Sequence, residues 1–165
     1  MIIAKELIDA SIKSKNDAQK AREDALWSAI ESKMEAVAKL PGYIKDVMDT
    51  YRYVKSEDKK LGGLLWNVIC HEDKELGLGF CNAITDTPGE RCGVRPYYTM
   101  KCYYNLYVLE GKVLWGDLKN LKPLGEMKDN LSPEEYEGML SAMTLLIETV
   151  PAYAERIGEK LKGML

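Results

Sequence analysis

The chain has 165 residues, which fits a single domain, residues 1–165, with a hydrophobic core and no need of disulfide bonds. Hydrophobic residues make up 46% and charged residues 30%, an ordinary globular composition. The net charge of −3 and the pI near 5.4 argue against a phosphate-binding surface, so nucleic acid is not the expected partner.

The cysteines and the apolar runs bear on the compartment. No signal-peptide pattern precedes Cys70, Cys81, Cys92 and Cys102, and no apolar run approaches the roughly 20 residues that cross a bilayer. We therefore expect free thiols in a reducing, cytoplasmic setting with no membrane contact. The cysteines also lack the close C-x2-C pairs of zinc sites, so we expect neither a metal nor another cofactor.

The N-terminal segment, residues 1–56, has helical periodicity. It predicts a short helix over residues 2–13, a break at residues 14–16, and a second helix up to residue 40. The short helix is expected to point its apolar residues inward, at Ile3, Leu7, Ile8 and Ile12. A third helix follows over residues 43–54. The second helix starts its apolar stripe with Ala18, Ala21 and Ala25, whose small side chains let another helix approach, from the same chain or from a second copy.

Periodicity then changes, and residues 64–118 predict a four-stranded antiparallel meander. Its strands are expected at residues 64–71, 78–84, 97–109 and 113–118. The loop of residues 85–96 is rich in Gly and Pro and long enough to be functional.

The third of these strands is the expected centre of the sheet. Residues 97–109 hold five of the ten tyrosines, and alternation places two sets of side chains on opposite faces. One face reads as core, and the other is half polar and lined with phenols, at Tyr97, Thr99, Lys101, Tyr103, Asn105 and Tyr107. We expect that second face either to be exposed for recognition or to lie at the margin of the core.

The C-terminal segment, residues 132–163, carries a strong helix-start signal. Ser132 can cap the helix, Pro133 suits its first turn, and Glu135 can complete a capping box. Pro151 is expected to kink the helix. Helices, then a meander, then a long kinked helix predict the α+β class.

Catalytic chemistry has few candidates. His71 is the only histidine, so a thiol-dependent mechanism would have to pair it with Cys81 or Cys92. Cys92 has Arg91 and Arg95 near it, which would lower the pKa of its thiol. Nucleotide-binding, HExxH and G-x-S-x-G patterns are absent from the sequence, and His71 reads more simply as the end of a strand beside a charged turn.

The sequence therefore predicts a non-catalytic interaction protein that forms a homo-oligomer. It would bind a protein partner or a small ligand through the aromatic sheet face and the adjacent loop. The residues expected to bind are Arg91, Arg95, Tyr97, Lys101, Tyr103, Asn105 and Tyr107. Two alternatives stay open: a small cysteine-dependent enzyme using Cys92 or Cys81 with His71, and an RNA-binding sheet.

Overall fold

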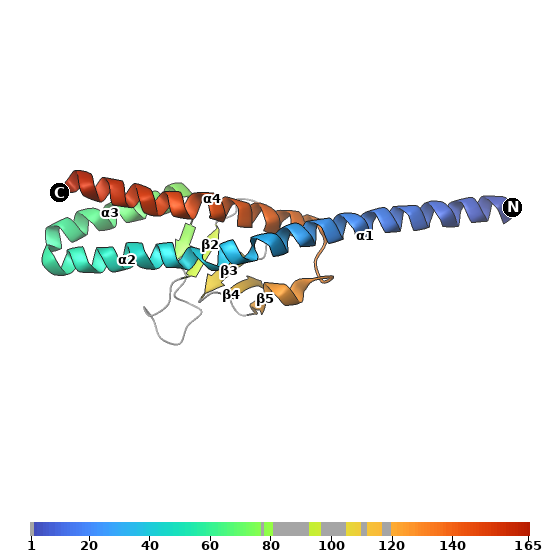
Figure 1. Cartoon of the computed structure of the whole chain (residues 1–165), viewed down its shortest axis with the longest axis horizontal. Helices are drawn as coiled ribbons and strands as arrows, with labels where there is room; N and C mark the ends of the chain where they lie inside the picture. Colours follow the sequence, from blue (N-terminus) through green and yellow to red (C-terminus); the bar gives the residue numbers. More distant parts are fainter. Residues whose placement is uncertain (1, 77, 81–92, 97–104, 110–111, 117–119) are drawn as a thin grey trace.

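The computed structural model describes residues 2–76, 78–80, 93–96, 105–109, 112–116 and 120–165. Within these residues the chain forms four α-helices and is predominantly helical (Figure 1). The helices are α1 (Ile2–Ala38), α2 (Leu40–Glu57), α3 (Lys59–Leu76) and α4 (Pro133–Met164). The N-terminus lies at one far end of the molecule, and the C-terminus lies at the other, next to the turn between α2 and α3.

A small antiparallel sheet accompanies the helices. Its strands follow the order β1-β2-β3-β4-β5, each paired with the next. They are β1 (Leu78–Phe80), β2 (Gly93–Pro96), β3 (Asn105–Leu109), β4 (Lys112–Gly116) and β5 (Lys122–Pro123), after which comes the 3₁₀ helix η1 (Leu124–Met127). Leu106 of β3 lies opposite Trp115 of β4, and both side chains enter the helical core.

The predicted fold class is wrong, because the molecule is mostly helical and the four-stranded meander over residues 64–118 is not what forms. Its expected first strand, residues 64–71, lies inside α3. Leu65, Ile69 and Glu72 are buried at helical spacing, and Leu64 is exposed. A short apolar run has no clear period of its own, so helix and strand could not be told apart there.

Other predicted element boundaries differ from those in the structure. The loop expected at residues 85–96 ends in strand β2. The expected strands at residues 78–84, 97–109 and 113–118 have described counterparts only in the shorter β1, β3 and β4. Residues 81–92 and 97–104 lie outside the described part of the chain.

The break expected at residues 14–16 is absent from α1, which is one continuous helix. No Gly or Pro occurs between residues 2 and 38. Ser and Asn lower helix propensity only modestly, so they do not interrupt a helix among good helix formers. The expected second and third helices instead meet at Lys39, between α1 and α2.

The core runs along α4, which packs against the second half of α1, against α2 and α3, and against β3 of the sheet. Its largest fully buried side chains come from all four helices, from β3 and from η1, and they are Ile30, Ile44, Leu65, Ile69, Leu106, Leu124, Tyr136, Met139, Met143, Leu146 and Tyr153. The α2–α3 hairpin depends on Gly62, because a Cβ there would stand 2.8 Å from Cα of Lys55. This glycine allows the two helices to approach closely.

The capping box predicted for α4 is confirmed. The Glu135 amide donates to the Ser132 hydroxyl at 3.2 Å, and the Ser132 amide donates back to the Glu135 carboxylate at 3.2 Å. The helix continues through Pro151 as a single element. No helix in the described ranges has a stretch long and apolar enough to cross a membrane.

Candidate interaction helix

The predicted site residues fall mostly where side chains are not described. Cys81, Arg91, Cys92, Tyr97, Lys101 and Tyr103 lie outside the described residues. The backbones of Arg95, Asn105 and Tyr107 are placed on β2 and β3, with Asn105 opposite Gly116 and Tyr107 opposite Leu114. Val94 of β2 pairs with Val108 of β3. Arg95 and Tyr107 are the next residues beyond this pair on the two strands.

His71 and Cys70 lie on α3, where neighbouring residues point about 100° apart, and both are exposed. The reading of His71 as a strand-end residue is therefore wrong. Partial burial, and then the charge of Asp73, raises the pKa of the Cys70 thiol. A raised pKa reduces the thiolate fraction at neutral pH, so Cys70 is a poor nucleophile.

Glu72, the residue after His71 in the chain, belongs to an ionic cluster between α3 and α4. Lys160 Nζ donates to Glu72 Oε1 at 2.7 Å, and Arg156 Nε lies 3.4 Å from Glu72 Oε2. These contacts, led by the hydrogen bond from Lys160, lower the pKa of the nearly buried Glu72. Burial raises the pKa of Asp73 to about 6, although a hydrogen bond from Tyr153 opposes that rise. The cluster ties the end of α3 to α4.

The described residues offer little for a metal. Among them, no three His, Cys, Asp or Glu side chains are grouped as a metal site would require. The cluster at Glu72 also has two cations against it, which satisfy its charge without an ion. We therefore assign it a structural role.

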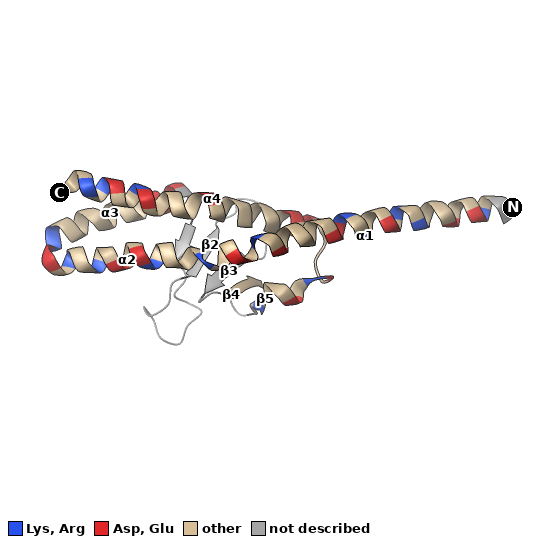
Figure 2. Ribbon diagram, viewed as in Figure 1, with Lys and Arg blue, Asp and Glu red and all other residues tan. Residues whose placement is uncertain are grey.

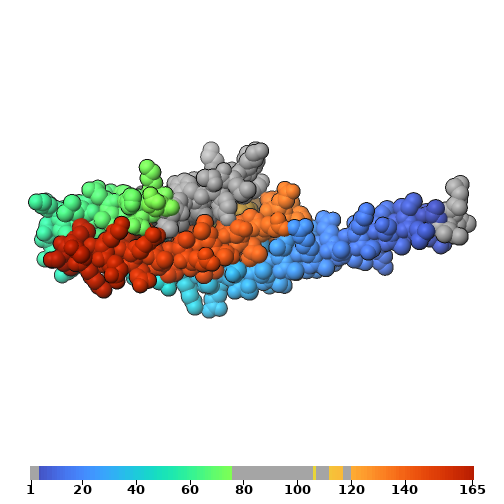
Figure 3. Space-filling model, turned by 90° about the horizontal axis from the view of Figure 1, so that it is seen from above, coloured from blue at the N-terminus to red at the C-terminus, as the bar shows by residue number. Residues whose placement is uncertain are grey.

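The most unusual feature is the first half of α1, which extends away from the rest of the molecule (Figures 1 and 3). We call residues 4–22 the projecting half of α1. Every residue in it is exposed. At about 1.5 Å per residue it is about 28 Å long. In proteins most of the stability of a helix comes from packing of one of its faces, so this exposed segment is suited to gain a neighbour.

Large apolar side chains lie on this segment without cover from the described part of their own chain. Leu7 is 66% exposed, Ile8 59% and Ile12 52%. Lysines and acidic residues occur along the same length, so charge bands of both signs surround the apolar positions (Figure 2). An exposed apolar cluster within a charged setting is typical of a protein-binding surface.

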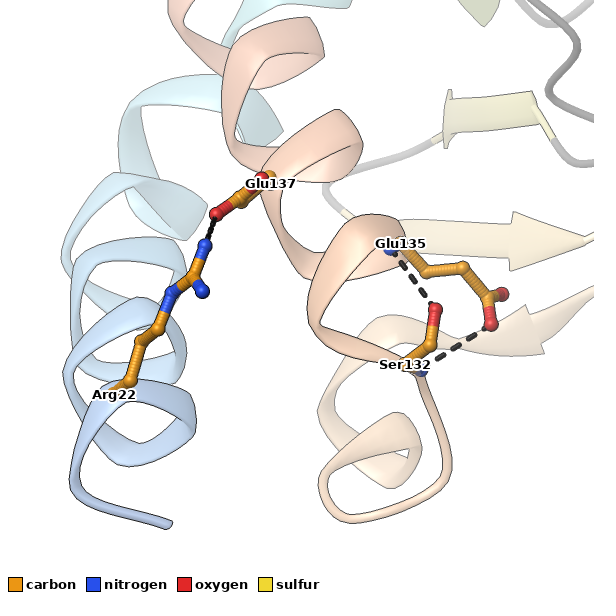
Figure 4. Close-up of polar contacts among 4 residues, drawn as sticks. All are labelled: Arg22, Ser132, Glu135 and Glu137. Carbon is orange, nitrogen blue, oxygen red and sulfur yellow. Dashed lines mark hydrogen bonds and ion pairs between the residues drawn. The ribbon is translucent and has the colours of Figure 1, made fainter. Parts of the chain in front are cut away.

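The base of the projecting half is anchored to the start of α4. Arg22 forms an ion pair with Glu137 (Figure 4), and the indole of Trp27 lies edge-on to Tyr136 with ring centroids 6.0 Å apart. The indole also donates to Glu31, while the Tyr136 hydroxyl accepts from the Asp129 amide at 2.8 Å. The base is therefore fixed and sets the direction in which the helix projects.

A hollow lies beside this anchor. It is formed by one turn of α1 and the first turn of α4, and its lining residues are Ala18, Gln19, Arg22, Ser132, Pro133, Glu134 and Glu137. It continues the surface of the projecting half toward the body of the molecule. A segment packed along α1 would therefore end at a polar, partly acidic site.

Sequence reasoning expected the apolar residues of the first helix to point inward, and for the projecting half that was wrong. Of the alanine stripe, Ala18, Ala21 and Ala25 are exposed, while the continuation at Ile30 and Val37 is buried. The signal that could have found the projection was the absence of Gly and Pro over residues 2–38. The 37 residues of α1 far exceed the roughly 10–14 residues of an average helix in a globular protein.

Comparisons with protein-family models, with curated proteins and with solved structures found no match to this chain.

Proposed function

We propose that this chain is a non-catalytic interaction protein whose binding element is the projecting half of α1. The observation that carries the proposal is the exposure of Leu7, Ile8 and Ile12 on a helix with no cover along residues 4–22. Covering these side chains removes apolar surface from water, at roughly 25 cal/mol per Å². A helical or grooved protein surface supplies such a cover better than a small molecule, because the exposed length is about 28 Å.

The aromatic face remains a second binding surface of the proposal. Tyr97, Lys101 and Tyr103 lie outside the described residues, so their part rests on the alternation of the sequence. A protein partner or a small ligand could use this face together with the loop of residues 85–96. Loss of binding in Tyr103→Ala and Tyr107→Ala variants, with binding through α1 intact, would assign it a role of its own.

The thiol-enzyme and RNA-binding readings have no described contact in their favour. A cysteine enzyme using Cys92 or Cys81 with His71 predicts one thiol that reacts with iodoacetamide much faster than the others. An RNA-binding sheet predicts affinity that falls steeply with salt. A fast thiol or such a salt dependence would replace the present proposal.

A cytoplasmic location belongs to the same proposal. It is supported by the free thiol of Cys70 and by the absence of any membrane-spanning helix in the described ranges.

The proposal is tested with two Leu→Glu substitutions at exposed positions. Leu7→Glu places a charge on the projecting half, where Leu7 is 66% exposed, and Leu64→Glu does so on α3, where Leu64 is 50% exposed. Both sites face water, so both variants should fold as the parent does by circular dichroism. We expect Leu7→Glu to weaken capture of partners from cells of the source organism, quantified by mass spectrometry, and Leu64→Glu to leave it unchanged. Equal capture by the parent and both variants would refute a binding role for α1.

A further inference from the structure

The distribution of charged residues along α1 indicates what kind of helix can pair with it. A heptad repeat can be laid on a helix in seven registers, and each register defines one line of a and d positions. In only one of the seven registers are all a and d positions from residue 4 to residue 32 free of charged residues. Its a and d positions are Ala4, Leu7, Ser11, Ser14, Ala18, Ala21, Ala25, Ser28 and Ser32, which we call the seam, and all of them are exposed.

Along the second half of α1 the seam faces away from the body of the molecule, whereas Ala18 lines the hollow beside the first turn of α4. Trp27, Ile30 and Val37 of the same helix are buried against the core, while Ala25, Ser28 and Ser32 are exposed. Two helices joined along their seams would therefore carry their bodies on the outside.

The positions that flank the seam are divided by charge. The charged residues at e positions are basic, Lys15 and Arg22, and those at g positions up to residue 31 are acidic, Asp17, Asp24 and Glu31. In a parallel pair each g residue faces the e residue five positions later on the other helix. Asp17 of one copy then faces Arg22 of the other, twice in a symmetric dimer.

An antiparallel pair has the opposite result. There e positions face e positions and g positions face g positions, so the basic flank meets the basic flank and the acidic flank meets the acidic flank. Like charges in contact weaken association. The parallel direction therefore brings one complementary pair together, Asp17 with Arg22, whereas Lys15, Asp24 and Glu31 face alanines.

We infer that the partner of α1 is a second copy of this chain, joined through a parallel two-stranded coiled coil along the seam. The inference rests on the proposed function, in which the projecting half is the binding element. Leu7 would pack on Leu7 of the partner, with Ile8 at its flank, and Asp17 would pair with Arg22. Because most seam positions are Ala or Ser, each layer buries little apolar surface, and the dimer dissociates on dilution.

Charge reversal tests the pairing in the full chain. Asp17→Arg places Arg against Arg22 of the partner, and Arg22→Asp places Asp against Asp17, so each variant alone should sediment as a monomer. Mixing the two variants restores both opposite-charge pairs, and the mixture should dimerise at the total concentration where each alone is monomeric. Loss of the ion pair from Arg22 to Glu137 has little effect on folding, because both groups are exposed.

Asp9→Arg is the matched control. Asp9 lies at position f, opposite the seam, and the substitution changes the net charge by the same amount. Its sedimentation should follow that of the parent chain at every concentration. An equal loss of dimer in Asp9→Arg and Asp17→Arg would show a general charge effect and overturn the pairing.

A cysteine substituted into the seam tests whether the two helices run parallel. In a parallel dimer Ser14→Cys brings the two new thiols together at a d position, and oxidation should give a disulfide from residue 14 to residue 14 in peptide maps. Asn16→Cys, at position f on the outer surface, should not form the equivalent link. A dimer without the link at residue 14 would overturn the parallel arrangement.

The results separate this inference from the proposed function. A parent chain that stays monomeric at all concentrations, or a dimer that Asp17→Arg does not weaken, overturns self-pairing. If partner capture still depends on Leu7 in that case, the projecting half binds a different protein and the proposed function stands. If neither self-association nor capture depends on α1, both are wrong.

Discussion

Along α1, residues 4–22 and residues 23–38 belong to one helix but have different surroundings. Ile12 and Ile30 are 18 residues apart, which is five full turns, so they point in the same direction from the helix axis. Ile12 is 52% exposed and Ile30 is fully buried. The position of a side chain on a helix therefore does not decide its burial. What decides it is whether α4 runs alongside, and α4 begins only at Pro133, near Arg22.

The largest effect expected from this comparison comes from truncating the two isoleucines. Ile30→Ala removes a buried side chain and leaves a cavity, which should lower the free energy of unfolding by about 2–5 kcal/mol. Ile12→Ala removes an exposed side chain and should change that energy by less than about 0.5 kcal/mol. Urea unfolding at low protein concentration measures both. Similar losses at the two sites would show that the projecting half packs against its own chain.

A smaller effect is expected from single methyl groups within the body. Gly62→Ala would place Cβ 2.8 Å from Cα of Lys55, so α2 and α3 must separate, at a cost of about 1–3 kcal/mol. Gly63→Ala is the control, because a Cβ there meets nothing within 4 Å. It should stabilise α3 by about 0.5–1 kcal/mol through helix propensity. A stable Gly62→Ala variant would mean that the body tolerates added volume as readily as the projecting half does.

The smallest of these effects is pH-dependent and belongs to the α3–α4 contact. Burial raises the pKa of Asp73 from 3.8 to about 6, so between these values the native state binds more protons than the unfolded state. Stability should therefore fall as pH rises from about 4 to about 6. Asp73→Asn should remove this slope and raise stability at pH 7 by about 1 kcal/mol, a figure reduced for partial exposure to water.

Urea unfolding at pH 4, 5, 6 and 7 checks that slope. Glu75→Gln, at an exposed position of the same helix, is the control and should keep it. Glu72 acts in the opposite direction, because its lowered pKa gives stability above pH 4.5 that is lost in acid. A slope unchanged by Asp73→Asn would mean that another group titrates in this window.

The sequence allowed some of this fold to be predicted, chiefly where signals are local. The capping box of Ser132 and Glu135 involves residues three positions apart, and it forms as expected. The sheet boundaries and α3 depend on tertiary contacts. Leu65 and Ile69 are buried because α2 and α4 lie beside them, which the apolar run of residues 64–71 does not encode by itself.

The candidate site was predicted less well, for a physical reason. Periodicity identified Leu7, Ile8 and Ile12 as apolar positions of a helix, but an apolar face looks the same whether its cover comes from the same chain or from another. The possibility of a second copy was stated for Ala18, Ala21 and Ala25, and these three residues do lie on the exposed seam. The expected binding residues Tyr97, Lys101 and Tyr103 lie outside the described residues and stay a prediction.

The contact of Trp27 with Tyr136 also gives the molecule an optical reporter. Trp27 is almost fully buried at the base of the projecting half, where its ring touches α4. In a variant with Trp66→Phe and Trp115→Phe, Trp27 is the single tryptophan, and its fluorescence should follow the docking of α1 on α4, whereas far-ultraviolet dichroism follows the helix content of the whole chain. Heating a dilute sample should lower the helical signal of the projecting half before the tryptophan signal changes. The order of these two transitions would give the stability of each half of the helix in a single melting experiment.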